Sequence, residues 1–273
     1  MTRRRSAMLS ALILATTLSG PALAAAPPPG PPTPAAWAAL ARLPDWSGIW
    51  TSDLADQVSQ FAKAPPAWTP EAARVAARMD ADDKAGHPHN FYLNCLPEGV
   101  PGLMLITRNA FEVLFTPGRV TLLGEMDGNR LRRIYTDGRD HPADPDLTFH
   151  GHSIGHWEGD TLVVDTVALL PELILPVSQS VGVANNGDMH VVERLHLAGP
   201  DELHDDLEII APHVLTAPWK TSRIFRRHRG PGDEIVEASC RQGDFIESKD
   251  ADGFAVFAPR GQDEGGAPVP TTP

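Results

Sequence analysis

The sequence is poor in positive charge and contains none of the common catalytic signatures. It has 23 lysines and arginines against 35 acidic residues, which gives a formal net charge of −12 at pH 7. Nucleic acids and anionic lipids are bound through basic surfaces, so this balance argues against both as partners. The chain also lacks a G-x-S-x-G elbow, an H-E-x-x-H motif, a glycine-rich phosphate loop and a dinucleotide fingerprint. A serine-triad hydrolase is therefore disfavoured, and no cofactor is expected.

No apolar run reaches the roughly 20 residues that a membrane-spanning helix needs. The apolar stretch over residues 7–18 follows three arginines and precedes Pro21-Ala22-Leu23-Ala24, a small-residue cleavage site. This order predicts a signal peptide over residues 1–24 that uses the general secretory route. We expect a periplasmic or secreted protein with no membrane insertion after cleavage. Loss of the three arginines takes the mature chain to about −15.

Cysteine is scarce, with only Cys95 and Cys240 in the chain. Zinc binding or nucleophilic catalysis needs partner residues at short spacing, and neither cysteine has them. Disulfides persist in exported proteins. A bridge between the two cysteines is therefore the default expectation.

Proline-rich composition predicts the limits of the folded part. Residues 25–40 are rich in proline and alanine, and residues 259–273 are rich in glycine and proline. Proline lacks the N–H that helices and sheets use, so we expect a disordered lead-in and a disordered tail. Residues 41–258 are expected to form a single β-rich domain. The oligomeric state stays open.

The pattern predicts one short helix near the N-terminus, followed by many strands. "TPEAARVAARMDADD" has Thr69 as N-cap and Pro70 at the first helical position. From about residue 110 the pattern has period two and is broken by tight-turn signals. The expected strands lie in "AFEVLFTPG", "RVTLLGEMDGN", "RLRRIYTDGRDHP", "HSIGHWEGD", "TLVVDTV", "MHVVERLHLAGPD", "ELHDDLEII", "KTSRIFRRHRGPGD" and "EIVEASC". We expect an antiparallel meander that closes into a barrel or a lipocalin-like calyx, because closure hides strand edges.

The segment "DWSGIW" precedes these strands. Trp46, Gly48 and Trp50 alternate as they would in a strand, and the G-x-W triplet resembles the first-strand signature of lipocalin-like barrels. That resemblance implies a small-molecule calyx, with Trp50 as a candidate binding residue. The plainer interpretation is a core tryptophan beside a glycine that permits close packing.

A second resemblance extends over nearly the whole folded part. "CLPEGVPGLM", "FEVLFTPGRVTLLGE", "RRIYTDGRDHP", "GHSIGHWEGDTLVVDT" and "HVVERLHL", in this order, resemble a large family of uncharacterised exported bacterial proteins. The resemblance implies a β-rich fold and supports pairing of the two cysteines. It implies no reaction.

The stretch "HSIGHWEGDTLVVDT" predicts a hairpin with a Gly159-Asp160 turn. Alternation then places one mostly polar set of side chains on a single face, namely His152, Ile154, His156, Glu158, Thr161, Val163 and Asp165. The opposite face, with Trp157, Leu162 and Val164, is apolar. The pairing sets Asp165 opposite Ile154 and beside His156.

Three interpretations of the polar face remain open. It is a solvated outer face, it lines a lumen or cleft where His and Asp act as general acid and base, or it holds a divalent metal. Four residues along a strand separate His152 from His156 by roughly 13 Å, which counts against a shared ion.

Neighbouring segments offer further groups to the same site. The loop "YTDGRDHP" contributes Tyr135, Asp137, Arg139 and His141. In "DMHVVERLHL", one strand face carries His190 and the other, apolar face carries Glu193. An acid on an apolar face is either paired with an arginine or held for function.

Two functional hypotheses follow. The first is a non-redox lyase, isomerase or hydrolase in a barrel pocket, with catalytic candidates His152, His156, Asp165, Tyr135, Asp137 and His190. Its candidate binding residues are Arg139, His141, Glu158, Glu193 and Trp50. The second is a non-catalytic calyx for a small apolar or aromatic ligand. They separate on whether the polar hairpin face looks into an enclosed cavity.

Overall fold

The structure is a computed structural model that describes residues 31–89, 96–106, 108, 110–125, 130–237, 245–249 and 255–259. Contacts divide the chain into Met1–Pro32 and Thr33–Pro273, and the helices and strands described below belong to the second unit. The predicted signal peptide, most of the predicted tail, Cys95 and Cys240 lie outside the described residues. No helix in the described ranges is long and apolar enough to cross a membrane.

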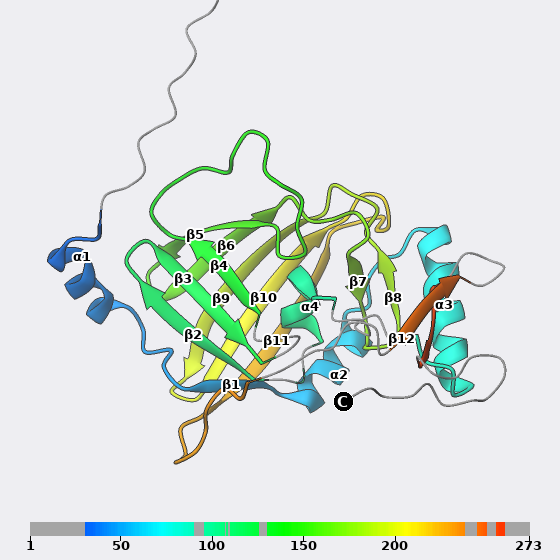
Figure 1. Cartoon of the computed structure of the whole chain (residues 1–273), viewed down its shortest axis with the longest axis horizontal. Coiled ribbons are helices and arrows are strands. Elements are labelled where there is room, and N and C mark those ends of the chain that lie inside the picture. Colours follow the sequence, from blue (N-terminus) through cyan, green and yellow to red (C-terminus); the bar gives the residue numbers. More distant parts are fainter. Residues whose placement is uncertain are drawn as a thin grey trace, which may run out of the picture. The chain divides into compact units, whose positions relative to one another are not determined.

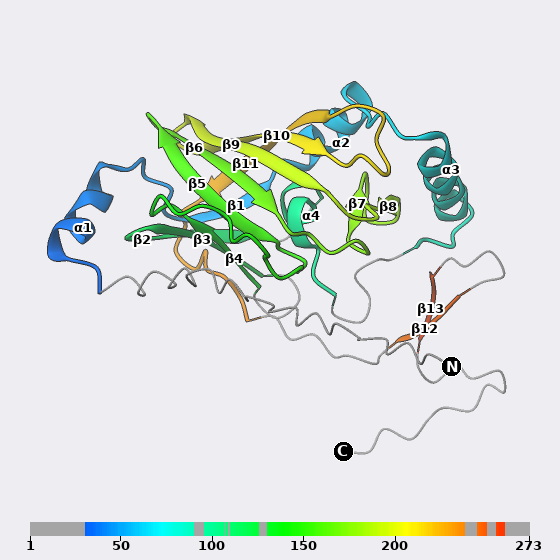
Figure 2. The same cartoon turned by 90° about the horizontal axis from the view of Figure 1, so that it is seen from above.

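Nine strands form a closed barrel, which confirms the predicted mainly β fold (Figures 1 and 2). Around the barrel the strands follow the order β1 (Ile49–Ser52), β11 (Trp219–His228), β10 (Glu202–Ile210), β9 (His190–Gly199), β6 (Thr161–Val167), β5 (His152–Glu158), β4 (Leu131–Tyr135), β3 (Arg119–Gly124) and β2 (Phe111–Thr116). β1 pairs with both β11 and β2 and so closes the ring.

The prediction of an all-antiparallel meander is wrong at one pair, because β4 and β5 run parallel. Parallel neighbours need a connection that returns the chain to the end where the first strand began. The loop over residues 136–151 makes this return, and it arches away from the strands at the top of Figure 1. The loop is later important because it contributes a histidine to the candidate site.

Helix α3 (Pro70–Lys84) confirms the one predicted helix, and the Thr69 hydroxyl accepts from the Ala72 N–H as its N-cap. Other elements were not predicted: α1 (Pro34–Ala39), the 3-10 helix η1 (Leu40–Arg42), α2 (Leu54–Lys63), α4 (Gly99–Leu105), the pair β7 (Ile174–Pro176) and β8 (Gly182–Ala184), and the pair β12 (Phe245–Lys249) and β13 (Ala255–Pro259). α1 lies inside the stretch expected to be disordered. It repeats the threonine-proline start of α3, with Thr33 as N-cap.

The strand expected in "EIVEASC" is wrong over residues 234–237, which have no strand structure, and residues 238–240 lie outside the described part. The reason is topological. β11 already pairs with β1, so the closed ring offers no free edge for another strand.

Aromatic side chains and α4 both contribute to the buried core. Trp46 packs against Phe115 and Trp157, with ring centroids 5.7 and 5.4 Å away, and so connects β2 to β5 across the interior. α4 is buried along its whole length, and it lies at the end of the barrel near β7 in both ribbon views (Figures 1 and 2). Trp46 and the apolar residues of α4 belong to one cluster of buried hydrophobic side chains.

The G-x-W segment contributes to this core. Gly48 has φ +99°, and a Cβ on it would lie 3.0 Å from the His228 carbonyl oxygen, so only glycine suits the position. Trp50 is fully buried; its indole N–H donates to the Trp46 carbonyl, and the Arg227 guanidinium lies 4.4 Å from its ring centroid. The plainer interpretation, a core tryptophan beside a close-packing glycine, describes what the structure contains.

Candidate functional site

The polar face of the β5–β6 hairpin lies on the outside of the barrel. The register is the predicted one, with Ile154 opposite Asp165 and Glu158 opposite Thr161. The alternate positions are the buried ones, namely Ser153, Leu162, Val164 and Thr166. The hypothesis that the polar face lines the lumen is therefore wrong, because the two faces of a barrel strand cannot both point inward.

Four of the predicted residues nevertheless come together on this outer wall, in a line that we call the His–Asp row: His152 on β5, His141 on the 136–151 loop, Asp165 on β6 and His190 on β9. The His152 and His141 Nδ1 atoms are 2.8 Å apart. His141 Nε2 lies 3.0 Å from Asp165 Oδ1, and His190 Nε2 lies 3.0 Å from Asp165 Oδ2. The His190 contact has the distance of an ion pair but not the geometry of a hydrogen bond.

The row is half-buried, which suits proton exchange with a bound solute. The side chains of His141, His190 and Asp165 are 21%, 35% and 41% exposed. Burial, followed by the charges of His141 and Arg139, lowers the pKa of His152. A neutral His152 is thus favoured beside its histidine partner. The two facing Nδ1 atoms need one proton between them, whichever ring carries it.

Two further predicted residues stack on the end of the row. The Tyr135 ring packs on the His152 ring, with centroids 5.4 Å apart and planes inclined by 25°. The Arg139 guanidinium lies 4.0 Å from the Tyr135 ring centroid. Asp137 holds this arginine through several hydrogen bonds, which lower the pKa of Asp137 and raise that of Arg139. Asp137 therefore orients Arg139 and does not reach the row.

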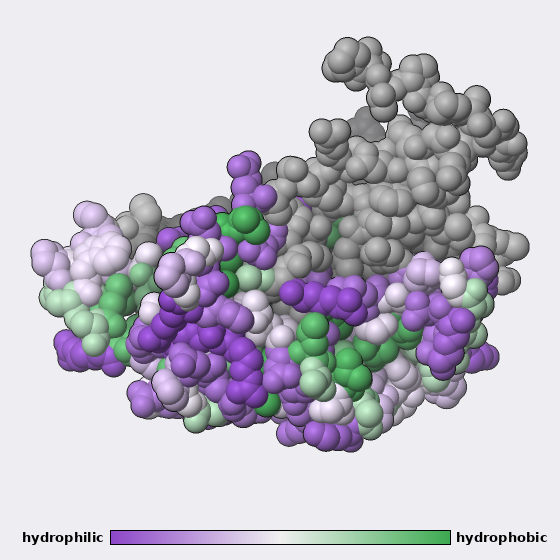
Figure 3. Space-filling model, turned by 90° about the horizontal axis from the view of Figure 1, so that it is seen from below, coloured by the Kyte–Doolittle hydropathy of each residue, from purple (hydrophilic) through white to green (hydrophobic). Residues whose placement is uncertain are grey.

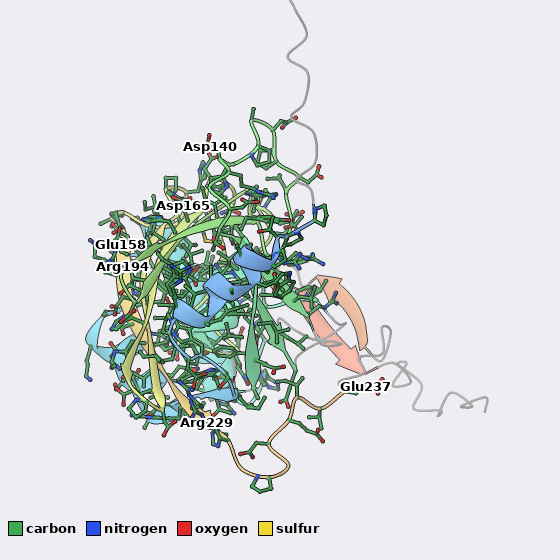
Figure 4. The ribbon with its side chains drawn as sticks, turned by 90° about the vertical axis from the view of Figure 1, so that its left-hand side faces the viewer. Asp140, Glu158, Asp165, Arg194, Arg229 and Glu237 are labelled. Carbon is green, nitrogen blue, oxygen red and sulfur yellow. The ribbon has the colours of Figure 1, made fainter. Side chains whose placement is uncertain are left out.

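His156 and Glu158 do not belong to the row. His156 Nε2 contacts Glu158 Oε1 at 3.2 Å, and Glu158 also pairs with Arg194 at 2.8 Å. Figure 4 shows Glu158 beside Arg194 at the edge of the barrel, apart from Asp165. The sequence placed Asp165 beside His156 because Asp165 stands opposite Ile154, two residues from His156 on the same strand, which makes Asp165 and His156 diagonal neighbours. In the structure, His141 and His190 occupy both carboxylate oxygens of Asp165.

Glu193 points into the barrel, where Arg132 pairs with it. Arg132 Nη1 donates to Glu193 Oε1 at 2.8 Å, and Nη2 donates to Oε2. Although burial alone would lower the pKa of Arg132, the Glu193 carboxylate raises it. The guanidinium crosses β5 and β6 to reach β9, and on the way it donates to Thr166 at 3.1 Å. The structural pairing expected for Glu193 is thus present, and its partner is a residue that the sequence analysis did not single out.

Sequence reasoning also missed Asp205 and Arg223, which are buried inside the barrel. The signal was available. Asp205 stands between Leu203 and Leu207 at inward positions of its strand, just as Glu193 stands among apolar neighbours on β9. Charged residues that share the parity of a buried face indicate an interior polar cluster.

Within the described ranges, no three His, Cys, Asp or Glu side chains are arranged to hold a metal ion. The surface seen from below mixes hydrophilic side chains with smaller apolar areas (Figure 3). No protein-family model matches the chain, and no curated protein matches it.

Proposed function

We propose that the protein is an exported, small-molecule-binding β-barrel whose outer wall carries a non-redox acid–base site, the His–Asp row. One observation carries this proposal: Asp165 lies between two histidines at 3.0 Å each, and one of them continues to His152 at 2.8 Å. A carboxylate that orients an imidazole fixes which ring nitrogen exchanges a proton with a substrate.

The row suits reactions in which a proton is removed at one point and returned at another. Histidine titrates near neutral pH, and a carboxylate partner stabilises the imidazolium that forms when the ring accepts a proton. Asp165 is shared by His141 and His190, so protonation of one ring changes the electrostatic field at the other. Histidines with a carboxylate partner can carry out the acid–base steps of a hydrolase, lyase or isomerase.

Tyr135 and Arg139 would bind the substrate beside the row. The arginine lies over the tyrosine ring and the tyrosine lies over His152, so a solute that contacts this stack is held next to the acid–base groups. Arg139 is 39% exposed and its position is fixed by Asp137, which reduces the entropy lost on binding.

Export and family membership are part of the proposal and rest on the sequence alone. The arginines, apolar run and small-residue site over residues 1–24 support export. The motif "GHSIGHWEGDTLVVDT" supports membership of the uncharacterised exported family. A mature N-terminus directly after Ala24, read from protein purified from its native cell, would support the first point. An intact Met1 would contradict it.

The acid–base proposal is tested with p-nitrophenyl acetate, an activated ester whose hydrolysis is accelerated by a neutral imidazole. We expect a rate above that of buffer that falls in Asp165→Asn by roughly a hundredfold, the usual contribution of a positioned acid–base group. The same variant should move the NMR signals of the His141 and His190 rings, because they lose their shared carboxylate.

His156→Ala is the matched control. His156 lies on the same strand as His152, but it is 66% exposed and outside the row. We expect it to retain wild-type hydrolysis and to leave the NMR signals of the His141 and His190 rings unchanged. Equal losses in both variants, or a wild-type rate in Asp165→Asn, would show that the row is not the acid–base site.

A further inference from the structure

A second pair of histidines lies on the outer wall of the barrel, toward the other end of β9 from the His–Asp row. His196 on β9 and His204 on β10 are direct register partners, and both are half-buried. Their ring centroids are 5.4 Å apart, and the ring planes are inclined by 57°. The neighbours Leu195 and Leu203 are buried, so both imidazoles are on the outer face. The row uses His190, at the start of β9 and therefore roughly 20 Å away along the strand.

Glu202 fixes the orientation of the His204 ring. His204 Nε2 lies 2.6 Å from Glu202 Oε1, and this hydrogen bond is the main cause that lowers the pKa of Glu202. The ionised carboxylate can only accept, so Nε2 carries the proton and the lone pair of the neutral ring is on Nδ1. Arg226 holds Glu202 in turn, and it also pairs with Asp53 at 3.1 Å. Metal-binding histidines commonly have such a carboxylate on the nitrogen that does not bind the metal.

His196 has a ring nitrogen that no other described group uses. Its ring contacts His204, and within the described part of the chain it makes no hydrogen bond or ion pair. A neutral imidazole has one nitrogen with a lone pair. Arg194, two residues away on the same face, pairs with Glu158 at 2.8 Å and so adds no unpaired positive charge. The two histidines therefore offer two lone pairs on adjacent strands.

The separation of the two rings fits one metal ion bound by both. A zinc ion about 2.0–2.1 Å from an imidazole nitrogen is roughly 3.2 Å from the ring centroid. Two such rings with centroids 5.4 Å apart enclose an angle of roughly 115° at the ion. This angle is close to the tetrahedral one that zinc prefers. The spacing of β9 and β10 thus already suits an ion between the rings.

We propose that His196 and His204 together bind a divalent transition-metal ion, with water at the remaining coordination positions. Imidazole suits Zn²⁺ and Cu²⁺, whereas Mg²⁺ prefers oxygen ligands. Two protein ligands agree with the absence of a three-residue metal group among the described residues. Structural zinc sites have four protein ligands, so this ion is exchangeable and can take a further ligand. The site does not depend on the acid–base role of the row.

The test titrates the full chain, without a histidine tag, with Zn²⁺, Cu²⁺ or Mg²⁺ alone in isothermal titration calorimetry at constant ionic strength. We expect Cu²⁺ to bind more tightly than Zn²⁺, the usual order for nitrogen ligands. Mg²⁺ should bind at least about a hundredfold more weakly than Zn²⁺, because it prefers oxygen. Equal affinities for Mg²⁺ and Zn²⁺ would show that the acidic surface collects the ions. That result, or no binding of Zn²⁺ and Cu²⁺, would overturn the proposal.

Variants locate the bound ion. Glu202→Gln should weaken Zn²⁺ binding by about 10–100-fold, the usual effect of a residue that orients a metal ligand. His196→Ala and His204→Ala should weaken it further, since each removes one of the two ligands. His213→Ala is the matched control, because His213 is another surface histidine beside a carboxylate, with Nε2 3.2 Å from Asp188 Oδ2. Wild-type binding in either ligand variant, or an equal loss in His213→Ala, would contradict the assignment.

His152→Ala separates this site from the His–Asp row, which also contains histidines. We expect the variant to bind Zn²⁺ as the wild type does, because His152 lies on β5 and does not contact His196 or His204. A loss in His152→Ala equal to that in His204→Ala would place the ion in the row and would overturn the proposal.

Discussion

Glu193→Gln should destabilise the barrel strongly, because it leaves Arg132 as an unpaired cation in a fully buried position. The guanidinium loses two charge-assisted hydrogen bonds to Glu193 and keeps one good bond, to Thr166 at 3.1 Å. Each lost bond to a charged group is worth about 1.5–3 kcal/mol, and the new amide oxygen restores part of one. We expect a loss of about 3–5 kcal/mol in the free energy of unfolding, the usual cost of breaking a buried pair.

The double variant Arg132→Met/Glu193→Leu should recover most of this loss. It removes both charges together, so neither is left in the interior without a partner. The hydroxyls of Ser153 and Thr166 remain satisfied, because they hydrogen-bond to each other at 2.8 Å. We expect the double variant to lie within about 2 kcal/mol of the wild type.

Urea unfolding followed by tryptophan fluorescence measures these differences, since the chain has six tryptophans, including Trp46 and Trp50 in the core. Glu158→Gln is the matched control, because it weakens the exposed ion pair with Arg194 on the outer wall. Its unfolding midpoint should stay close to that of the wild type. Equal destabilisation in the single and the double variant would refute the reasoning, because the loss would then not come from an unpaired charge.

Two further perturbations test local features near the α4 end of the barrel. Burial, with help from the Arg132 and Arg130 charges, lowers the pKa of His150 from 6.5 to about 4. The stability associated with neutral His150 is present above pH 6.5 and is lost as the pH falls toward 4, because the unfolded chain then binds the proton more readily. The free energy of unfolding should fall by about 3 kcal/mol between pH 7 and pH 4, and this fall should be absent in His150→Phe. Urea unfolding at the two pH values measures it. An identical pH dependence in both proteins would contradict the role of His150. Gly151→Ala should lower the free energy of unfolding by about 1–3 kcal/mol or more. Gly151 has φ +63°, and a Cβ on it would lie 2.3 Å from the Val167 carbonyl oxygen. An unchanged melting temperature would contradict this prediction, because it would show that the backbone relaxes.

Much of the barrel could be predicted from the sequence because its strands have one wet and one buried face. Along β6 the buried and half-buried residues alternate without interruption, as period two requires. The short helix α4 could not be predicted from a face pattern, whereas α2 carried a signal that was overlooked, namely an Asp53 N-cap before an amphipathic segment. α4 is buried on all sides, so its sequence lacks the amphipathic period by which a surface helix is recognised. The parallel β4–β5 pair was missed for a different reason, because strand direction depends on the path of a long loop rather than on local pattern.

The candidate site shows the same division between what alternation determines and what it leaves open. Alternation correctly placed His152 and Asp165 on one face, but it does not say which face of a strand points into a closed barrel. The structure shows which face points inward. Ser153 is buried at the alternate positions of β5, just as Glu193, Asp205 and Arg223 are buried on the inward faces of their own strands. His141 joins the row only because the loop crosses over β5 and β6, a contact between segments that no pattern within one strand encodes.

Inner and outer polar groups therefore call for different kinds of evidence. On the outer wall a polar residue is the default and costs nothing, so only the short contacts of Asp165 with two histidines distinguish the row from an ordinary wet face. Inside the barrel every charge carries a desolvation cost, and the cost is offset only when a partner is present. Arg132 has such a partner in Glu193, while Arg223 has the charges of Asp56 and Asp205 nearby and the Phe61 ring 4.4 Å from its guanidinium. The Glu193→Gln variant tests this offset directly, without any assumption about what the His–Asp row does.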